Sequence, residues 1–217
     1  MKCYICNNVS TSYEHVPAKC FFPKGNRLNL IKVLSCDTHN LETSKDDEYI
    51  RNIISMTKGA NNIAVEHFRN KGIASFKRSP ALQARIASKP MFLNLIKDDE
   101  TTKGLTYEVE RERFDKVMKK IAYGLYFHEY KRTWEKELVI STDRLITPSY
   151  ETDIVAPEIK KYSFLKADTI FEGDNPEVFQ YTFIDFPRQN EKFMFMKFYE
   201  VFEVWVLPKQ YSKFATL

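Results

Sequence analysis

The sequence lacks any run of about eighteen consecutive apolar residues, the length that a helix needs to cross a bilayer, so we expect no membrane partner. It also begins without an apolar run preceded by basic residues, so we expect no secretory signal and a cytoplasmic protein. All four cysteines lie within the first 36 residues, and the rest of the chain contains none. This distribution excludes a disulfide framework along the chain and favours metal ligation in a reducing compartment. Internal repeats and low-complexity tracts are absent as well.

The apolar content that is present is enough for an ordinary core. The chain has 217 residues and 43% hydrophobic residues, which suits one large domain or two small ones. Helical spacing in the middle of the chain and aromatic stretches near its end predict an α+β protein. We expect a small metal-stabilised unit at 1–58, a basic helical segment at 59–100 and an α+β accessory domain at 101–217, ending in a β-hairpin or small antiparallel sheet.

The spacing of apolar and turn residues predicts individual elements. They are a strand at 33–35, a helix at 41–57, two or three helices at 60–97, a linker at 98–106, a helix at about 114–128, loops at 145–163, and a hairpin of 179–186 with 193–207.

Positive charge is concentrated in one segment. Residues 58–97 carry eight Lys and Arg against one acid, Glu66, whereas the net charge of the whole chain is +4. A segment this rich in Lys and Arg is typical of proteins that bind a phosphate backbone. A solvated basic helix without a partner has the same composition and is the alternative. The candidate nucleic-acid-binding residues are Lys58, Arg69, Lys71, Lys77, Arg78 and Arg85.

Two short motifs in the first forty residues have the spacing of metal ligands. Cys3 and Cys6 form one pair, and Cys36 with His39 forms a second pair at the same spacing. Such turns each supply two ligands to a tetrahedral structural Zn²⁺, which would stabilise a lobe too small to bury its own core. Three free cysteines and a surface histidine are the alternative. Cys20 has no partner at this spacing, and we expect it in the core.

An acid–histidine dipeptide lies between the two halves of this site. Glu14 and His15 precede Val-Pro, and Asn40 follows His39 directly. Hydrolysis of a phosphodiester requires a base that deprotonates water and a cation on the leaving oxygen. A neutral histidine can be that base, while an acid and an amide can hold Mg²⁺ or Mn²⁺. The alternative is a histidine that only packs beside the zinc.

These motifs resemble the signature of the HNH endonucleases, the ββα-metal nucleases. The residues that match are Cys3–Cys6, Glu14–Pro17, Cys36–Asn40 and Ser44–Glu48, within residues 1–55. The resemblance implies a zinc-stabilised hairpin and helix around one catalytic divalent metal, acting on DNA or sometimes RNA. It also implies that His15 is the general base, Glu14 the metal ligand beside it, and Asn40 the last residue of the signature.

The sequence departs from that signature in its second half. His39 stands where a cysteine is usual, and Asn40 where a histidine is usual. Either His39 binds zinc and Asn40 belongs to the catalytic centre, or His39 is the last signature residue and zinc has three cysteine ligands. We favour the first assignment because it keeps the ligand spacing. Asn29, on the segment that leads to Cys36, is the candidate for the middle asparagine of the signature.

The leading hypothesis is a metal-dependent HNH endonuclease that hydrolyses phosphodiester bonds in DNA, or in RNA. Its C-terminal region would then contact a protein partner or shape the substrate channel. One alternative is a zinc-stabilised nucleic-acid-binding module without catalysis. The other is a protein-interaction scaffold that uses the acidic, aromatic C-terminal region.

Overall fold

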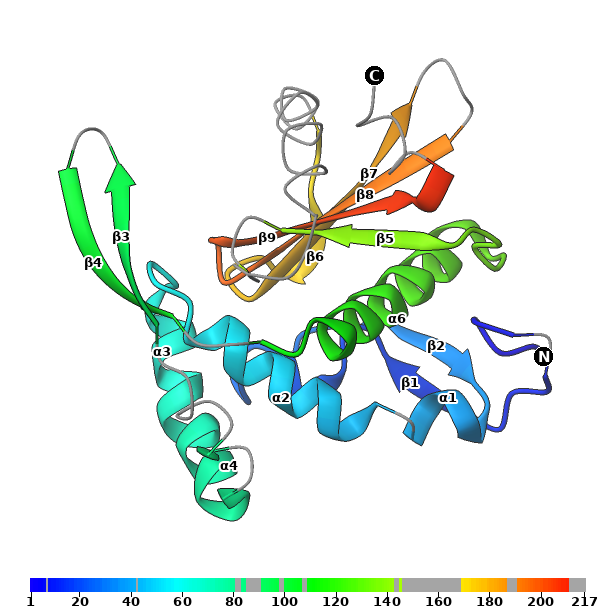
Figure 1. The fold of residues 1–217 in the computed structure, drawn as a ribbon. Coiled ribbons are helices and arrows are strands. Elements are labelled where there is room, and N and C mark those ends of the chain that lie inside the picture. The colour runs from blue at the N-terminus through cyan, green and yellow to red at the C-terminus, as the bar shows by residue number, and fades with distance from the viewer. Residues whose placement is uncertain are drawn as a thin grey trace.

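The computed structural model describes residues 1–6, 8–41, 43–80, 83–84, 91–97, 100–106, 109–142, 145, 169–186 and 191–210. Within these residues the protein is mixed α+β, as expected, with an N-terminal hairpin, a helical middle and a C-terminal antiparallel sheet (Figure 1). None of the described helices combines the length and the apolar character that a membrane crossing requires.

The N-terminal unit is a two-stranded hairpin followed by two helices. Strands β1 (Ser12–His15) and β2 (Lys32–Ser35) are antiparallel, with a short 3-10 helix, η1 (Lys19–Phe21), in the connection between them. Helices α1 (Asp37–Leu41) and α2 (Ser44–Ser55) follow directly. The strand predicted at 33–35 is therefore confirmed, and the helix predicted at 41–57 is α2 with slightly shorter bounds.

The middle of the chain is helical only in its first part. Helices α3 (Asn62–His67), η2 (Phe68–Gly72, a π-helix) and α4 (Ile73–Arg78) follow one another, and the Asn61 side chain caps α3 by accepting a hydrogen bond from Ala64 N at 3.1 Å. Residues 91–97 and 98–106 were expected to be helix and linker, and this expectation is wrong. They contain β3 (Met91–Lys97) and β4 (Glu100–Thr106), which pair as an antiparallel ribbon.

A long helix and a five-stranded sheet form the rest of the described chain. Helix α6 (Arg111–Tyr130) includes the predicted helix. The sheet is antiparallel in the order β5-β9-β8-β7-β6. Its strands are β5 (Leu138–Ser141), β6 (Glu172–Asn175), β7 (Phe179–Phe186), β8 (Glu191–Phe198) and β9 (Phe202–Pro208).

The predicted C-terminal hairpin is confirmed as β7–β8. Its second strand, predicted at 193–207, is divided into the two strands β8 and β9. The chain reverses between β8 and β9 at Tyr199 and Glu200, which have positive φ values of 46° and 67°. The loops predicted at 145–163 lie almost entirely outside the described residues.

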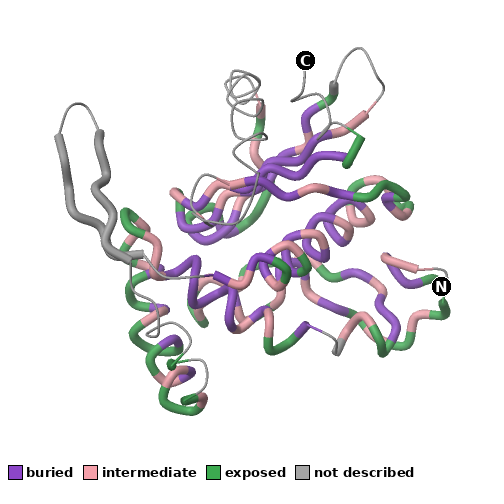
Figure 2. The backbone as a smooth tube through the Cα atoms, viewed as in Figure 1, coloured by how far each residue is buried: buried purple, intermediate pink, exposed green. Residues whose placement is uncertain are grey.

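Helix α6 is packed between the sheet and the N-terminal hairpin (Figure 1). One buried apolar cluster extends from Cys3 and Tyr4 through α6 to β9, and Figure 2 shows this burial along α6 and the central strands. Strand alternation divides β8 between two sides, because Met194 and Met196 join this cluster whereas Phe193 and Phe195 join a smaller one. The N-terminal unit and the C-terminal region thus share a core, and the domain limits near residues 58 and 100 stay predictions.

Candidate metal and phosphodiester site

The four predicted zinc ligands lie together at one end of the N-terminal unit. Cys3 and Cys6 come from the turn before β1, Cys36 follows β2, and His39 lies on α1. Their ligand atoms are all within 4.8 Å of one another. Nδ1 of His39 lies 3.5, 3.5 and 3.3 Å from the three sulfur atoms in chain order, and the sulfurs of Cys6 and Cys36 are 3.9 Å apart.

These distances fit a tetrahedral zinc ion. With Zn–S bonds of about 2.3 Å and Zn–N bonds of about 2.0 Å, tetrahedral angles place the ligand atoms about 3.5 to 3.8 Å apart. The chemistry fits as well. Burial by itself would raise the pKa of the Cys3 thiol, but backbone hydrogen bonds at Ile5, Cys36 and Cys6 outweigh burial and lower it to about 6, which favours the thiolate. The residues present can therefore hold a structural Zn²⁺.

The structure separates the roles of His39 and Asn40. His39 belongs to the metal cluster, which agrees with the first of the two assignments. The side chain of Asn40 instead donates a hydrogen bond to Ser12 Oγ at 2.8 Å and ties α1 to β1. Cys20 packs against the core, as expected, and burial raises the pKa of its thiol to about 12.

Glu14 lies inside the protein and is fully engaged. Its carboxylate accepts a hydrogen bond from Tyr4 Oη at 2.9 Å and pairs with Lys120 Nζ at 2.5 Å. Lys120 pairs in turn with Asp47 Oδ2 at 3.0 Å. Burial raises the pKa of Glu14, and the charge of Lys120 opposes that effect. With Glu14 bound to an ammonium and Asn40 to a hydroxyl, these two residues as arranged do not fit the predicted Mg²⁺ or Mn²⁺ site.

His15 lies on the opposite face of the hairpin. Neighbouring residues in a strand point to opposite sides, and Glu14 is buried whereas His15 is half-buried. Burial lowers the pKa of His15, and the charges of Lys32, Lys19 and Arg27 lower it further. Lys32 is the register partner of His15 across the hairpin. A neutral imidazole among three cations is therefore present at the end of β1.

Asn29 belongs neither to the Cys/His cluster nor to the ion pairs around Glu14. It has a positive φ of 41° and lines a cavity of about 500 Å³ between the hairpin, the end of α6 and β6. Other residues that line this cavity are Lys32, His128 and Tyr181. Asn175 holds this segment in place through two hydrogen bonds with the backbone of Leu28, at 3.1 and 2.8 Å.

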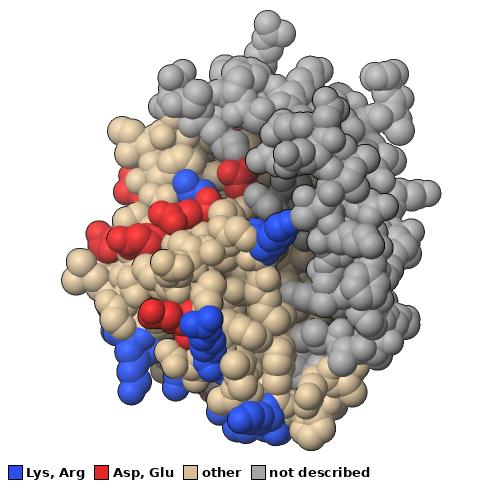
Figure 3. All heavy atoms as spheres, turned by 90° about the vertical axis from the view of Figure 1, so that its left-hand side faces the viewer, with Lys and Arg blue, Asp and Glu red and all other residues tan. Residues whose placement is uncertain are grey.

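Five of the six predicted nucleic-acid-binding residues are described, and all five are exposed. Lys58 follows α2, Arg69 and Lys71 lie on η2, and Lys77 and Arg78 lie on α4. Arg85 lies outside the described residues. Figure 3 shows basic side chains gathered at the lower edge of the face on which α3 and α4 lie, below a band of acidic ones.

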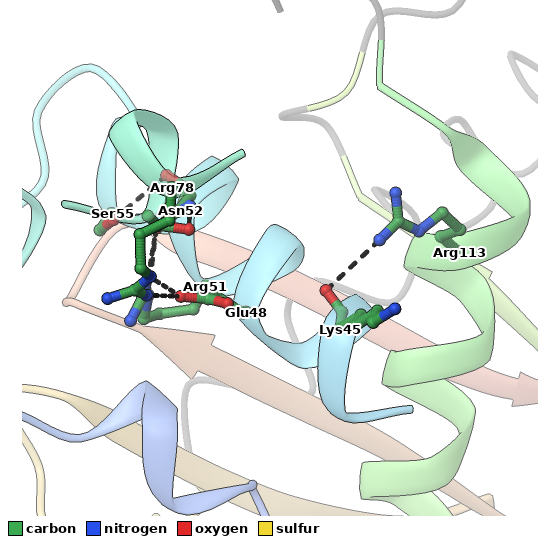
Figure 4. A network of polar contacts seen from close by, with 8 residues as sticks. Lys45, Glu48, Arg51, Asn52, Ser55, Arg78 and Arg113 are labelled. Atoms are coloured by element: carbon green, nitrogen blue, oxygen red, sulfur yellow. Dashed lines mark hydrogen bonds and ion pairs between the residues drawn. The ribbon is translucent and has the colours of Figure 1, made fainter. Parts of the chain in front are cut away.

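Polar contacts attach this basic segment to α2 (Figure 4). Glu48 pairs with Arg78 at 2.8 Å and with Arg51 at 3.7 Å. Arg51 donates to Asn52 Oδ1 at 2.5 Å, and Asn52 donates to Ser75 Oγ at 3.2 Å. The buried members of this network fix the position of α4 relative to the N-terminal unit.

Sequence reasoning missed the cations around His15 and the partner of Glu14. The cations around His15 could have been found from composition, because residues 16–35 contain four basic residues and no acid. They are Lys19, Lys24, Arg27 and Lys32. Nothing in the sequence indicates that Lys120 pairs with Glu14. Lys120 is more than a hundred positions away and lies beside another lysine on an amphipathic helix.

The chain matches no protein-family model, no curated protein sequence and no solved structure. The resemblance to HNH endonucleases therefore rests on the sequence motifs alone.

Proposed function

We propose that the protein is an HNH-type endonuclease that cleaves phosphodiester bonds in nucleic acid, DNA in the first place, with His15 as its general base. The observation that carries the proposal is the position of His15 at the end of β1, half-buried among Lys19, Arg27 and Lys32. The Cys/His cluster supports it, because its residues join the start of β1, the end of β2 and α1 at one end of the hairpin and so hold the strand that carries His15 at its other end.

The chemistry follows from charge and protonation. Because burial and the nearby cations lower its pKa, the His15 imidazole is neutral at pH 7 and can accept a proton from the attacking oxygen. The same cations attract the scissile phosphate and stabilise the negative charge that develops on it.

The substrate would extend from His15 toward the basic segment. Arg27 acts electrostatically on His15 and also on His67, whose pKa is lowered by burial and then by Arg51, Arg27 and Lys71. Arg27 and Lys71 line one cavity of about 440 Å³ between residues 23–27 and the helices α3 and η2, and the acid Glu66 lines it as well. Basic side chains thus occur both at the end of β1 and on η2, the kind of residues that contact a phosphate backbone.

The decisive experiment is cleavage of labelled DNA and RNA by the zinc-loaded protein, with and without Mg²⁺ or Mn²⁺. His15→Ala is the test variant and His128→Ala the matched control, since His128 is also a half-buried histidine with a lowered pKa. We expect His15→Ala to abolish cleavage while retaining binding, and His128→Ala to keep both. Equal cleavage by His15→Ala and wild type would overturn the role of His15.

A zinc-stabilised nucleic-acid-binding module without catalysis is the second candidate. The observation that favours it is the burial of Glu14 in an ion pair, which removes the predicted metal ligand from the surface. The same experiment separates the two functions, because wild-type protein that binds nucleic acid without cutting it is a binding module. A protein partner at the C-terminal region stays a prediction.

A further inference from the structure

The positive charge beside buried Glu14 is the ammonium group of a lysine of the protein itself, Lys120. Lys120 Nζ is 2.5 Å from Glu14 Oε1 and 3.0 Å from Asp47 Oδ2. It also donates a hydrogen bond to Thr43 Oγ1. These oxygens come from β1, from α2 and from the residue that precedes α2. Two carboxylates and a hydroxyl that converge on one point are the ligands that a hard divalent cation takes in proteins.

The cluster has more negative than positive charge. The side chains of Lys120, Glu14 and Asp47 are only 5 to 6% exposed, and they carry two carboxylates against one ammonium. Burial by itself lowers the pKa of Lys120, but the two carboxylates outweigh burial and raise it. Asp47 Oδ1 is buried and has no hydrogen-bond partner among the described residues. Buried carboxylates in this arrangement require a cation between them.

Close packing of α6 on β1 brings the ammonium to this point. Lys120 and Gly124 are four residues apart on α6 and so lie on one face of the helix. Glu14 on β1 and Val16 in the bend that follows it are both buried, and both lie against α6. A Cβ atom built on Gly124 would lie 2.5 Å from Val16 Cγ1. The missing side chain at Gly124 therefore permits the approach that places Lys120 against Glu14.

We propose that Glu14, Asp47 and Thr43 form a cation site whose resident cation is the Lys120 ammonium, in place of a divalent metal. The wild-type protein then takes up no Mg²⁺ or Mn²⁺ at Glu14, which corrects the role that the resemblance to HNH endonucleases implies for this residue. The inference does not rest on the nuclease proposal, because it concerns cation binding in the absence of nucleic acid.

The Lys120 ammonium and a divalent metal ion would compete for the same oxygen atoms around Glu14, and this competition decides which of them the site holds. A divalent ion at Glu14 would displace the ammonium, and α6 would then hold a buried positive charge without its two carboxylate partners. Neutralising Lys120 removes that competition. The variant Lys120→Met keeps the length and apolar part of the side chain and leaves the oxygen ligands of Glu14, Asp47 and Thr43 for a metal.

The test is a Mn²⁺ titration of zinc-loaded protein, followed by electron paramagnetic resonance of the free ion. The proteins are wild type, Glu14→Gln, Lys120→Met and the double variant, with Lys116→Met as control because Lys116 is an exposed lysine one turn earlier on α6. We expect Lys120→Met to bind one Mn²⁺ more than wild type. We expect the double variant to lose that ion, and Glu14→Gln and Lys116→Met to match wild type.

Two results would overturn the inference. One is a Mn²⁺ ion bound by wild type and lost in Glu14→Gln, because the site would then take metal in spite of Lys120. The other is a folded Lys120→Met protein, with zinc content and circular dichroism of wild type, that binds no additional Mn²⁺.

A second measurement decides the question if Lys120→Met does not fold. Lysine amines of native wild-type protein are reductively methylated with and without Mn²⁺, and the modified positions are identified by mass spectrometry. We expect Lys120 to stay unmodified in both samples, with exposed Lys116 modified as the internal control. Methylation of Lys120 only when Mn²⁺ is present would show displacement of the ammonium and overturn the inference. Absence of nucleic-acid cleavage leaves both measurements unaffected.

Discussion

Substituting Gly124 by alanine tests how closely α6 packs on the hairpin. The added Cβ would lie 2.5, 3.0 and 3.1 Å from three side-chain carbons of Val16, which is itself buried. Val16 cannot withdraw easily, because its backbone N–H is bonded to Ile31 O at 3.0 Å. The new methyl group must therefore separate α6 from the strand that carries Glu14 and His15.

Two opposing effects set the size of the change. Alanine is a better helix former than glycine by about 1 kcal/mol, which alone would stabilise the protein. Overpacking of a tight contact costs about 1 to 3 kcal/mol. We therefore expect Gly124→Ala to lower the free energy of unfolding by up to about 2 kcal/mol. Val16→Ala should cost about 2 kcal/mol through lost burial and a cavity.

A double-mutant cycle in urea unfolding measures the contact directly. In the double variant the methyl group added at position 124 occupies space that the Val16 side chain leaves. The double variant should therefore lose less free energy of unfolding than the sum of the two single losses, by about 1 to 3 kcal/mol. The m-value should stay unchanged. A Gly124→Ala protein that is more stable than wild type, or an additive cycle, would refute the close approach.

Four further predictions concern metal, charge and pH. Cys36→Ser should lose the bound zinc and the hydrogen-exchange protection of β1 and β2, measured by metal analysis and mass spectrometry, whereas undiminished zinc would contradict the ligand assignment. Arg27→Ala and Lys32→Ala should each weaken nucleic-acid binding and reduce the slope of log affinity against log salt by about 0.9 on duplex DNA, unlike Lys209→Ala, whose lysine follows β9 and pairs with Glu137. His67 has a pKa of about 4 in the folded protein against an ordinary value of 6.5, so the unfolded chain binds the proton first and stability falls as pH drops from 6.5 toward 4. The loss, up to about 3 kcal/mol, should be absent in His67→Gln and is measured as the urea midpoint against pH. Because the pKa of His15 is lowered below its ordinary value of 6.5 and the base acts unprotonated, the pH at which cleavage falls to half its full rate should lie below 6.5.

Elements with long, regular patterns were predictable from the sequence. Helix α6 was predicted because its apolar residues repeat at helical spacing over many turns, and the β7–β8 hairpin because aromatic stretches flank a polar turn. The strands β3 and β4 were missed for the opposite reason. Each is seven residues long, and a short apolar run such as that of β3 fits a helix or a strand equally until its pairing partner is known.

The Cys/His cluster was predictable because the spacing of metal-binding residues is a local feature of the sequence. Each pair of ligands occupies one turn, and the spacing within a pair is imposed by the coordination of one ion. The surroundings of Glu14 were not predictable, since they depend on a lysine from a distant helix and on how closely that helix approaches. Pairing of this kind is decided by tertiary packing, which leaves no spacing rule in the sequence.

The dipeptide Glu14-His15 shows how extended chain divides two adjacent functional residues. In a helix or turn the two side chains could act on one ligand, but in β1 they point to opposite faces. Glu14 joins α6 to the hairpin through Lys120, whereas His15 remains on the side that carries Lys19, Arg27 and Lys32. Under the proposed function, Glu14 would affect catalysis by His15 only through the position of the strand. Loss of its charge should act first on stability, and loss of the imidazole should act on cleavage alone.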